Sequence, residues 1–278
     1  MVHEAILLSW WGKVFGGTFG FMLGGPLGAL LGASLGHNFD RGMGRLDSIS
    51  GMRNTDQVET IQSAFFTATF FMMGHISKVD GRVSQDEIQV AQHVMRQMNL
   101  NTEQKKVAIN LFEQGKNQDI QVDEVLDQFR KECHRRRNLM QMFLEILVMT
   151  ALADGALHKS EEKALWETAQ TLGFSNSDFQ HILGRGQAQQ HYQQNRRTHS
   201  SRSSDRGRLN LTDAYQLLGI TASASNQEVK KAYRRQMNQH HPDKLVSKGL
   251  PQEMMDIANQ KTQDIKTAYE LIKQTRNI

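Results

Sequence analysis

An imidazole and a carboxylate stand two positions apart in His241-Pro242-Asp243, near the end of the 278-residue chain. These residue types take part in acid–base chemistry in many proteins. Here the sequence offers them no nucleophile–base pair, no metal-ligand spacing of histidines and no glycine-rich phosphate loop. We therefore expect the tripeptide to belong to a binding surface. The protein is expected not to be an enzyme and to need no cofactor.

The residues before this tripeptide predict an amphipathic helix. Ser225 and Glu228 have the spacing of a capping box, which starts a helix. At 100° per residue, one side of the helix is expected to be buried and the other collects basic residues. The buried side holds Val229, Ala232, Tyr233, Gln236 and His240, and the opposite face holds Lys230, Lys231, Arg234 and Arg235.

Four like charges on one helix face repel one another, which is unfavourable in isolation. A surface that stays cationic in spite of this repulsion suits an acidic partner, and a plain solvated face is the alternative. Pro242 disfavours helical geometry at His241, so the helix must stop there. Asp243 is then displayed in a turn.

These features resemble a J domain, the module of DnaJ-type co-chaperones. The resemblance covers residues 209–278, and the matching positions are Tyr215, Leu218, Lys230-Lys231-Ala232-Tyr233-Arg234-Arg235, His241-Pro242-Asp243-Lys244 and Ile265-Lys266-x-Ala268-Tyr269. It implies a helical hairpin that docks on a DnaK-type chaperone ATPase and favours ATP hydrolysis in that partner. The partner-binding residues it implies are Lys230, Lys231, Arg234, Arg235, His241, Pro242, Asp243 and Lys244. Gln236 departs from the pattern, because J domains usually carry an aliphatic residue there.

The middle of the chain contains an internal duplication at an offset of 74 residues. Asp80-Gly81 matches Asp154-Gly155, and Glu87 matches Glu161. In both copies an apolar helical stretch runs into Asp-Gly and then into an acidic helix start. A repeated helix–turn–helix unit is the simplest explanation.

The duplicated turns also have part of the spacing of a calcium-binding loop, with glycine at position six and glutamate at position twelve. Positions one and three hold Ile76 and Lys78 in the first copy and Thr150 and Leu152 in the second, so ligands are missing. We favour a glycine turn followed by a helix N-terminus, and predict no metal site. The weak metal candidates are Asp80, Glu87, Asp154 and Glu161.

The two Asp-Gly turns resemble the TerB-like (tellurite-resistance) helical domain, over residues 55–183. This resemblance implies an all-helical bundle that serves as a docking or sensing module, and it implies no reaction. The region holds 13 basic and 18 acidic side chains. Its one cysteine, Cys133, precedes His134 and three arginines; we read this cluster as a solvated helix face, with an activated thiol as the alternative.

Residues 14–36 contain no charged residue and predict a transmembrane helix. As a helix they would span about 34 Å, enough for a hydrocarbon core of about 30 Å. Arg41, Arg45 and Arg53 follow the span, whereas only Lys13 closely precedes it. The positive-inside rule then places the short segment 1–13 outside and the bulk of the chain in the cytoplasm.

Glycine recurs at every fourth position of this span. Such a ridge of small residues lets two helix backbones approach closely, which favours a homodimer over a plain glycine-rich anchor. The predicted dimerisation residues are Gly16, Gly20, Gly24, Gly28, Gly32 and Gly36.

Residues 184–208 are rich in Gln, Ser and Arg and almost free of apolar side chains, which predicts a disordered linker. Its six arginines could meet acidic headgroups or RNA, but a soluble tether is the preferred interpretation, and no nucleic-acid partner is expected. The single cysteine excludes an intrachain disulfide and favours a reducing compartment.

The sequence thus predicts an all-α protein with a transmembrane helix, a TerB-like bundle, a linker and a J domain at residues 209–278. This order resembles membrane-anchored DnaJ-like co-chaperones of the bacterial inner membrane. It implies a regulatory partner of a DnaK-type chaperone. The alternative is a membrane-bound scaffold or sensor that acts mainly through the bundle.

Overall fold

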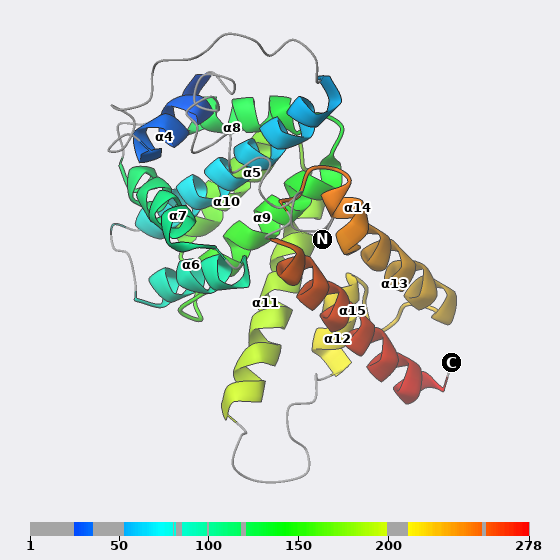
Figure 1. Ribbon diagram of the computed structural model, residues 1–278. Coiled ribbons are helices and arrows are strands. Elements are labelled where there is room, and N and C mark those ends of the chain that lie inside the picture. Colours follow the sequence, from blue (N-terminus) through cyan, green and yellow to red (C-terminus); the bar gives the residue numbers. More distant parts are fainter. Residues whose placement is uncertain are drawn as a thin grey trace.

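The computed structural model describes residues 25–35, 53–79, 81, 85–98, 100–117, 121–198, 211–251 and 254–277. Helices and their connecting turns make up this part of the chain, and no strand occurs among these residues (Figure 1). The all-α prediction is confirmed.

The bundle is built around α5 (Arg53–Lys78), whose residues 61–74 are all buried. Five further helices surround or extend it: α6 (Gln85–Gln97), α7 (Thr102–Gly115), α8 (Val122–Glu132), α9 (Arg137–Ala151) and α10 (Lys159–Thr171). Phe65 of α5 packs against Phe129 of α8 and Phe143 of α9, with ring centroids 6.1 and 6.2 Å away. Helices α5 and α7 touch backbone to backbone at Gly74 and Gly115.

The internal duplication is visible as a repeated turn. Gly81 and Gly155 have φ angles of 92° and 98°, which favour glycine. Each donates its N–H to the carbonyl three residues earlier, Lys78 O at 2.8 Å and Leu152 O at 3.2 Å. The two copies therefore use the same turn geometry before α6 and α10.

The predicted transmembrane helix lies partly outside the described residues. Its described part is α4 (Gly25–Leu35), which packs against α5, α7 and α8. Leu27, Leu30 and Leu31 are buried there, and the Leu27 N–H donates to Gln128 Oε1 over 2.8 Å. Among the helices that the structure describes, none has both the length and the apolar character needed to cross a membrane.

The prediction that a disordered linker begins at residue 184 is wrong. Helix α11 (Asn176–Thr198) continues through this segment, and residues 199–210 lie outside the described part. The polar composition of this segment predicted disorder, but a few small residues are enough to let the helix pack against its neighbours. Gly186 lies so close to α9 that a Cβ there would be 2.5 Å from Val148 Cγ1, and Ala188 is fully buried against the C-terminal helices.

The C-terminal domain consists of α12 (Leu211–Leu218), α13 (Asn226–His240), α14 (Pro242–Val246) and α15 (Met255–Arg276). Helices α13 and α15 form the predicted hairpin around Leu218, Val229 and Ala268. At its far end, Arg276 Nε donates to Tyr215 Oη over 2.6 Å, which ties the end of α15 to α12.

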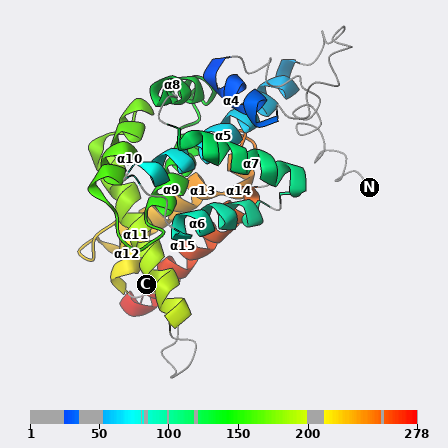
Figure 2. The same cartoon turned by 90° about the vertical axis from the view of Figure 1, so that its left-hand side faces the viewer.

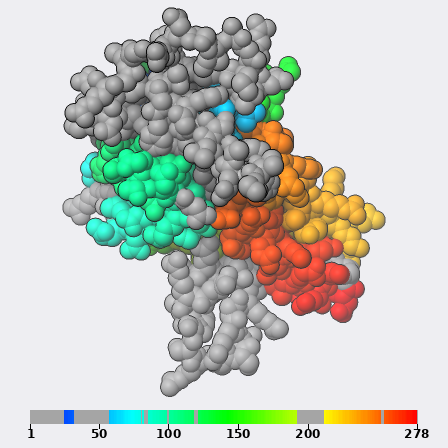
Figure 3. Space-filling view, viewed as in Figure 1, coloured from blue at the N-terminus to red at the C-terminus, as the bar shows by residue number. Residues whose placement is uncertain are grey.

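The C-terminal domain and the bundle share one apolar core. Leu245, Leu250, Met254, Ile257 and Ala258 are buried in the same cluster as the phenylalanines of α5. Figure 2 shows α15 beside α6, and in Figure 3 the orange and red surface of the C-terminal helices adjoins the cyan to green surface of the bundle.

Candidate docking site and the interface behind it

Helix α13 has the predicted cap and the predicted two faces. The Ser225 N–H donates to Glu228 Oε2 over 2.7 Å, and the Glu228 N–H donates to Ser225 Oγ over 3.3 Å. Val229, Ala232, Gln236 and His240 are buried, and Tyr233 is half-buried. All four predicted cations of the opposite face are exposed: Lys230, Lys231, Arg234 and Arg235.

The helix stops at His240 as Pro242 requires. His241 has φ −60° and ψ 122°, an extended geometry, and Pro242 is the first residue of α14. The side chains of His241 and Asp243 are 45% and 84% exposed, with His241 Nδ1 3.9 Å from Asp243 Oδ2. Lys244 Nζ donates to Asn238 Oδ1, so this lysine extends the exposed cationic face of α13.

Gln236 is buried, as the helical wheel predicts, at a position where an aliphatic residue would fit better. Only 1% of its surface is exposed, and its Oε1 has no hydrogen-bond partner. A buried amide oxygen without a partner is destabilising. The departure from the J-domain pattern therefore has a physical consequence inside the hairpin.

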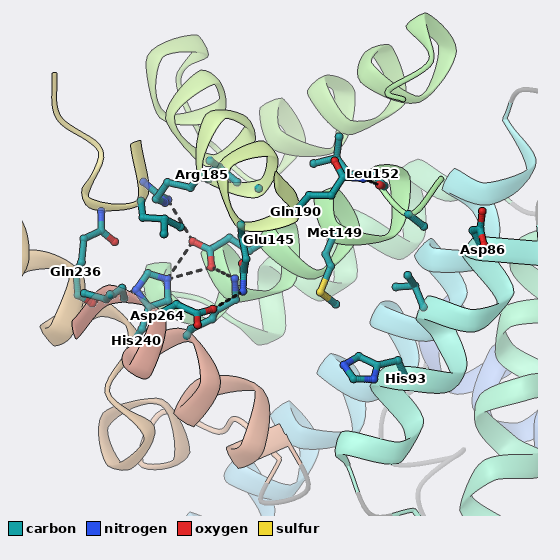
Figure 4. Close-up of a pocket in the computed structure, with 18 of the residues that line it drawn as sticks. Asp86, His93, Glu145, Met149, Leu152, Arg185, Gln190, Gln236, His240 and Asp264 are labelled. Atoms are coloured by element: carbon teal, nitrogen blue, oxygen red, sulfur yellow. Dashed lines mark hydrogen bonds and ion pairs between the residues drawn. The ribbon is translucent and has the colours of Figure 1, made fainter. Parts of the chain in front are cut away.

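Behind the exposed loop, the bundle places a buried carboxylate against the end of α13 (Figure 4). His240 Nε2 lies 3.0 Å from both carboxylate oxygens of Glu145, a residue of α9. Lys261 of α15 and Arg185 of α11 contact the same carboxylate at 2.9 and 3.2 Å. Burial alone would raise the pKa of Glu145, but the charges of His240, Lys261 and Arg185 hold it well below its usual value.

Sequence reasoning missed Glu145 and its partners. Residues 140–149 are apolar except for Gln141 and Glu145, and a lone carboxylate in a buried helix requires a partner. That signal was available. The identity of the partner was not, since His240 lies 95 positions away.

A cavity of about 220 Å³ lies beside this cluster, between the bundle and the C-terminal domain. Its polar wall includes Glu145, Gln236, His240 and Lys261, and Met149 contributes apolar surface.

The remaining predicted site residues fall elsewhere. Glu87 and Glu161 are both buried, and the pKa of Glu161 is raised to about 7 by burial and by the charge of Glu87, against a hydrogen bond from His158. Glu161 acts as a helix-capping residue, since the His158 N–H donates to it over 2.9 Å. Asp154 Oδ1 accepts the Ala156 N–H, and Asp80 lies outside the described residues. Within the described ranges, no three His, Cys, Asp or Glu side chains could hold a metal ion.

Two other predictions concern single segments. Cys133 is buried in the bundle core, and burial raises the pKa of its thiol, so the alternative of an activated thiol is wrong.

Of the glycines in the predicted dimerisation ridge, Gly28 and Gly32 lie in α4, and Gly16, Gly20, Gly24 and Gly36 lie outside the described residues.

Of the predicted loop residues, Asp243 is exposed, His241 is half-exposed and Pro242 is buried. The helical hairpin, its cationic second helix and this His-Pro-Asp loop define a J-domain protein whose J domain packs on a helical bundle. Comparisons with family models agree. Residues 213–277 match the DnaJ domain, residues 66–183 match tellurite resistance protein TerB, and residues 8–46 match the co-chaperone DjlA transmembrane domain.

Relatives that match almost the whole chain are also named DjlA. The chain is 45% identical over 271 residues to co-chaperone protein DjlA of Shewanella oneidensis, a match that covers 98% of this chain and 100% of the relative. Identity to the proteins of that name from Photobacterium profundum and Vibrio cholerae is 44% and 42%, over 96% of this chain and 99% and 98% of the relatives. No solved structure gives a significant match. The chain belongs to the DjlA family of co-chaperones.

Proposed function

We propose that this chain recruits a DnaK-type chaperone to the membrane and stimulates ATP hydrolysis by that chaperone. One observation carries the proposal: the exposed cationic face of α13 leads directly into a loop that presents His241 and Asp243 to solvent. No other described surface combines the charge and the family's docking motif.

The two parts of this surface have different tasks. Lys230, Lys231, Arg234 and Arg235 attract and orient an acidic partner, which mainly affects how fast and in what orientation it binds. The loop acts after binding. To stimulate hydrolysis it must bind one conformation of the partner better than another, because only differential affinity shifts an equilibrium. The bond-making groups belong to the partner.

The test is ATP hydrolysis by a purified DnaK-type chaperone, with the full chain in detergent or vesicles. His241→Gln is expected to abolish the stimulation, since it removes the imidazole while leaving α13 unchanged. His181→Gln, at an exposed position of α11, is the matched control and should stimulate like the unchanged protein. Full stimulation by His241→Gln would reject the proposal.

We also propose a single-pass membrane protein with residues 1–13 outside and the bundle and J domain in the cytoplasm. The basic residues after the span support this orientation. A protease added to intact spheroplasts should leave residues 55–278 uncut and should degrade them after lysis. Digestion in intact spheroplasts would reject this orientation.

The cavity beside Glu145 favours a second function, in which the bundle binds a membrane partner or small ligand as a scaffold or sensor. The two functions are separable in cells. A His241→Gln chain that still supports the cellular role would favour the scaffold, whereas loss of that role would favour chaperone recruitment.

A further inference from the structure

We propose that Glu145 of the bundle is a positioning residue for the His-Pro-Asp loop: it holds His240, the last residue of α13, and so fixes the point from which the loop departs. The inference rests on the proposed stimulation of a DnaK-type chaperone. It assigns to the bundle a part in that activity, in addition to carrying the J domain.

The His240 ring is held at both nitrogens. Nδ1 lies 3.0 Å from the Gln236 carbonyl oxygen, and Nε2 lies 3.0 Å from both oxygens of Glu145. Both neighbours of the ring are hydrogen-bond acceptors, a carbonyl oxygen at Nδ1 and a carboxylate at Nε2. Since the ring is 5% exposed, water contributes little, and the carboxylate sets its orientation.

The same carboxylate joins two further elements to α9, because Lys261 brings in α15 and Arg185 brings in α11. Gln141, one turn earlier in α9, donates to Glu145 Oε1 over 2.9 Å. A buried carboxylate with this set of donors is fully paired. Removing its charge would leave three basic groups facing one another out of water, which opposes docking of α13 and α15 on the bundle.

A second anchor lies just beyond the loop. Leu245 and Leu250 are buried in the bundle core, and Gly249 sits against Ile61, where a Cβ would be 2.6 Å from Ile61 Cγ2. The chain is therefore attached to the bundle at His240 and again at Leu245. Between these anchors lie only residues 241–244, which comprise the docking loop and Lys244.

This arrangement separates two quantities that an ATPase titration measures. The exposed cations, which Glu145 does not touch, govern the concentration of co-chaperone that gives half-maximal stimulation. The direction in which the loop leaves α13 governs the maximal stimulation, because a misplaced loop binds the partner without favouring the right conformation. A positioning residue should affect the second quantity.

The experiment compares full-length chains with Glu145→Gln, His240→Leu and His240→Gln. We expect Glu145→Gln and His240→Leu to lower the maximal stimulation about fivefold or more, with the half-maximal concentration nearly unchanged. His240→Gln keeps an N–H donor toward Glu145 and should retain most of the stimulation. Glu167→Gln removes an exposed carboxylate of α10 and should behave like the unchanged chain.

Hydrogen exchange on the same samples shows whether each variant is folded. In Glu145→Gln, residues 240–246 should exchange faster while α5 stays protected. If α5 loses protection in this variant, His240→Leu decides, because it leaves the bundle intact. Maximal stimulation equal to or above that of the unchanged chain, in whichever variant is folded, overturns the inference. Failure of the unchanged chain to stimulate at all would instead overturn the proposed function on which the inference depends.

Discussion

Tyr233 of α13 stacks on Tyr269 of α15, with ring centroids 4.1 Å apart and ring planes inclined by 16°. The two rings join the cationic helix to its hairpin partner. Both residues are half-buried, and both belong to the segments that resemble the J domain.

Tyr269→Ala should destabilise the hairpin by about 1–3 kcal/mol, because the stack and its buried area are lost together. Urea unfolding followed by tyrosine fluorescence or hydrogen exchange of α13 measures the effect. Tyr269→Phe keeps the ring and should be close to neutral. A Tyr269→Ala chain as stable as the Phe variant would show that the stack contributes little.

Gln236→Met should stabilise the J domain by about 1 kcal/mol, since it removes a buried amide oxygen without a partner at similar side-chain volume. The backbone carbonyl of residue 236 still accepts from His240, so chaperone stimulation should be retained. Thermal unfolding of the two full-length chains provides the comparison. A lower Tm for the Met variant would mean that the amide has a role in the fold.

Glu161→Gln should change how stability depends on pH. The pKa of Glu161 is raised to about 7 from an ordinary 4.5, so the folded state binds a proton that the unfolded state has released. Stability from this group therefore falls as pH rises from 4.5 to 7. Glutamine can still accept the His158 N–H, and the variant should lack this decline. Denaturant unfolding across that pH range tests it; parallel curves for both chains would contradict the assignment.

The pH dependence of stability that comes from Glu145 has the opposite sign to that from Glu161. Its pKa is held below 4.5, so its contribution is present above 4.5 and is lost as pH falls through the lowered folded value. The interface between bundle and J domain should therefore weaken as the pH falls through that lowered value. Hydrogen exchange of residues 240–246 at decreasing pH, corrected for intrinsic rates, should show this opening in the unchanged chain. Early opening at neutral pH would contradict the pairing.

Gly74→Ala should be severely destabilising, by about 3 kcal/mol or more. An added Cβ would lie 1.9 Å from the Phe112 carbonyl oxygen, and backbone cannot move aside as a side chain can. Gly184→Ala in α11 has open space around it and should be neutral or slightly stabilising. Calorimetry of both variants checks the contrast; similar Tm values would show that α5 and α7 can separate without penalty.

For the predicted homodimer, replacing both Gly20 and Gly24 with Leu should abolish self-association in membranes, because the helices can no longer approach closely. Crosslinking in vesicles measures it. Leu23→Ala is the control, because it leaves every glycine of the ridge unchanged. This single substitution should leave self-association intact. Association that survives the double replacement would remove the glycine ridge from the proposal.

Local features were predictable because they depend on near neighbours in the sequence. The cap at Ser225, the two faces of α13 and the stop before Pro242 all follow from helix geometry and proline sterics. The contact between Glu145 and His240 was not predictable, because the spacing of residues along one helix does not identify which distant helix packs against that helix. The end of α11 was mispredicted for a related reason: its composition is polar, and only tertiary contacts at Gly186 and Ala188 reveal its packing.

Helix α11 belongs to both halves of the molecule, since Arg185 binds the bundle's carboxylate and Ala188 is buried with α12. The J domain is therefore attached to the bundle by side-chain contacts of α11 as well as by the chain that connects α11 to α12. A chaperone that binds this J domain would be held in a set orientation relative to the bundle, and clients would have to reach it there.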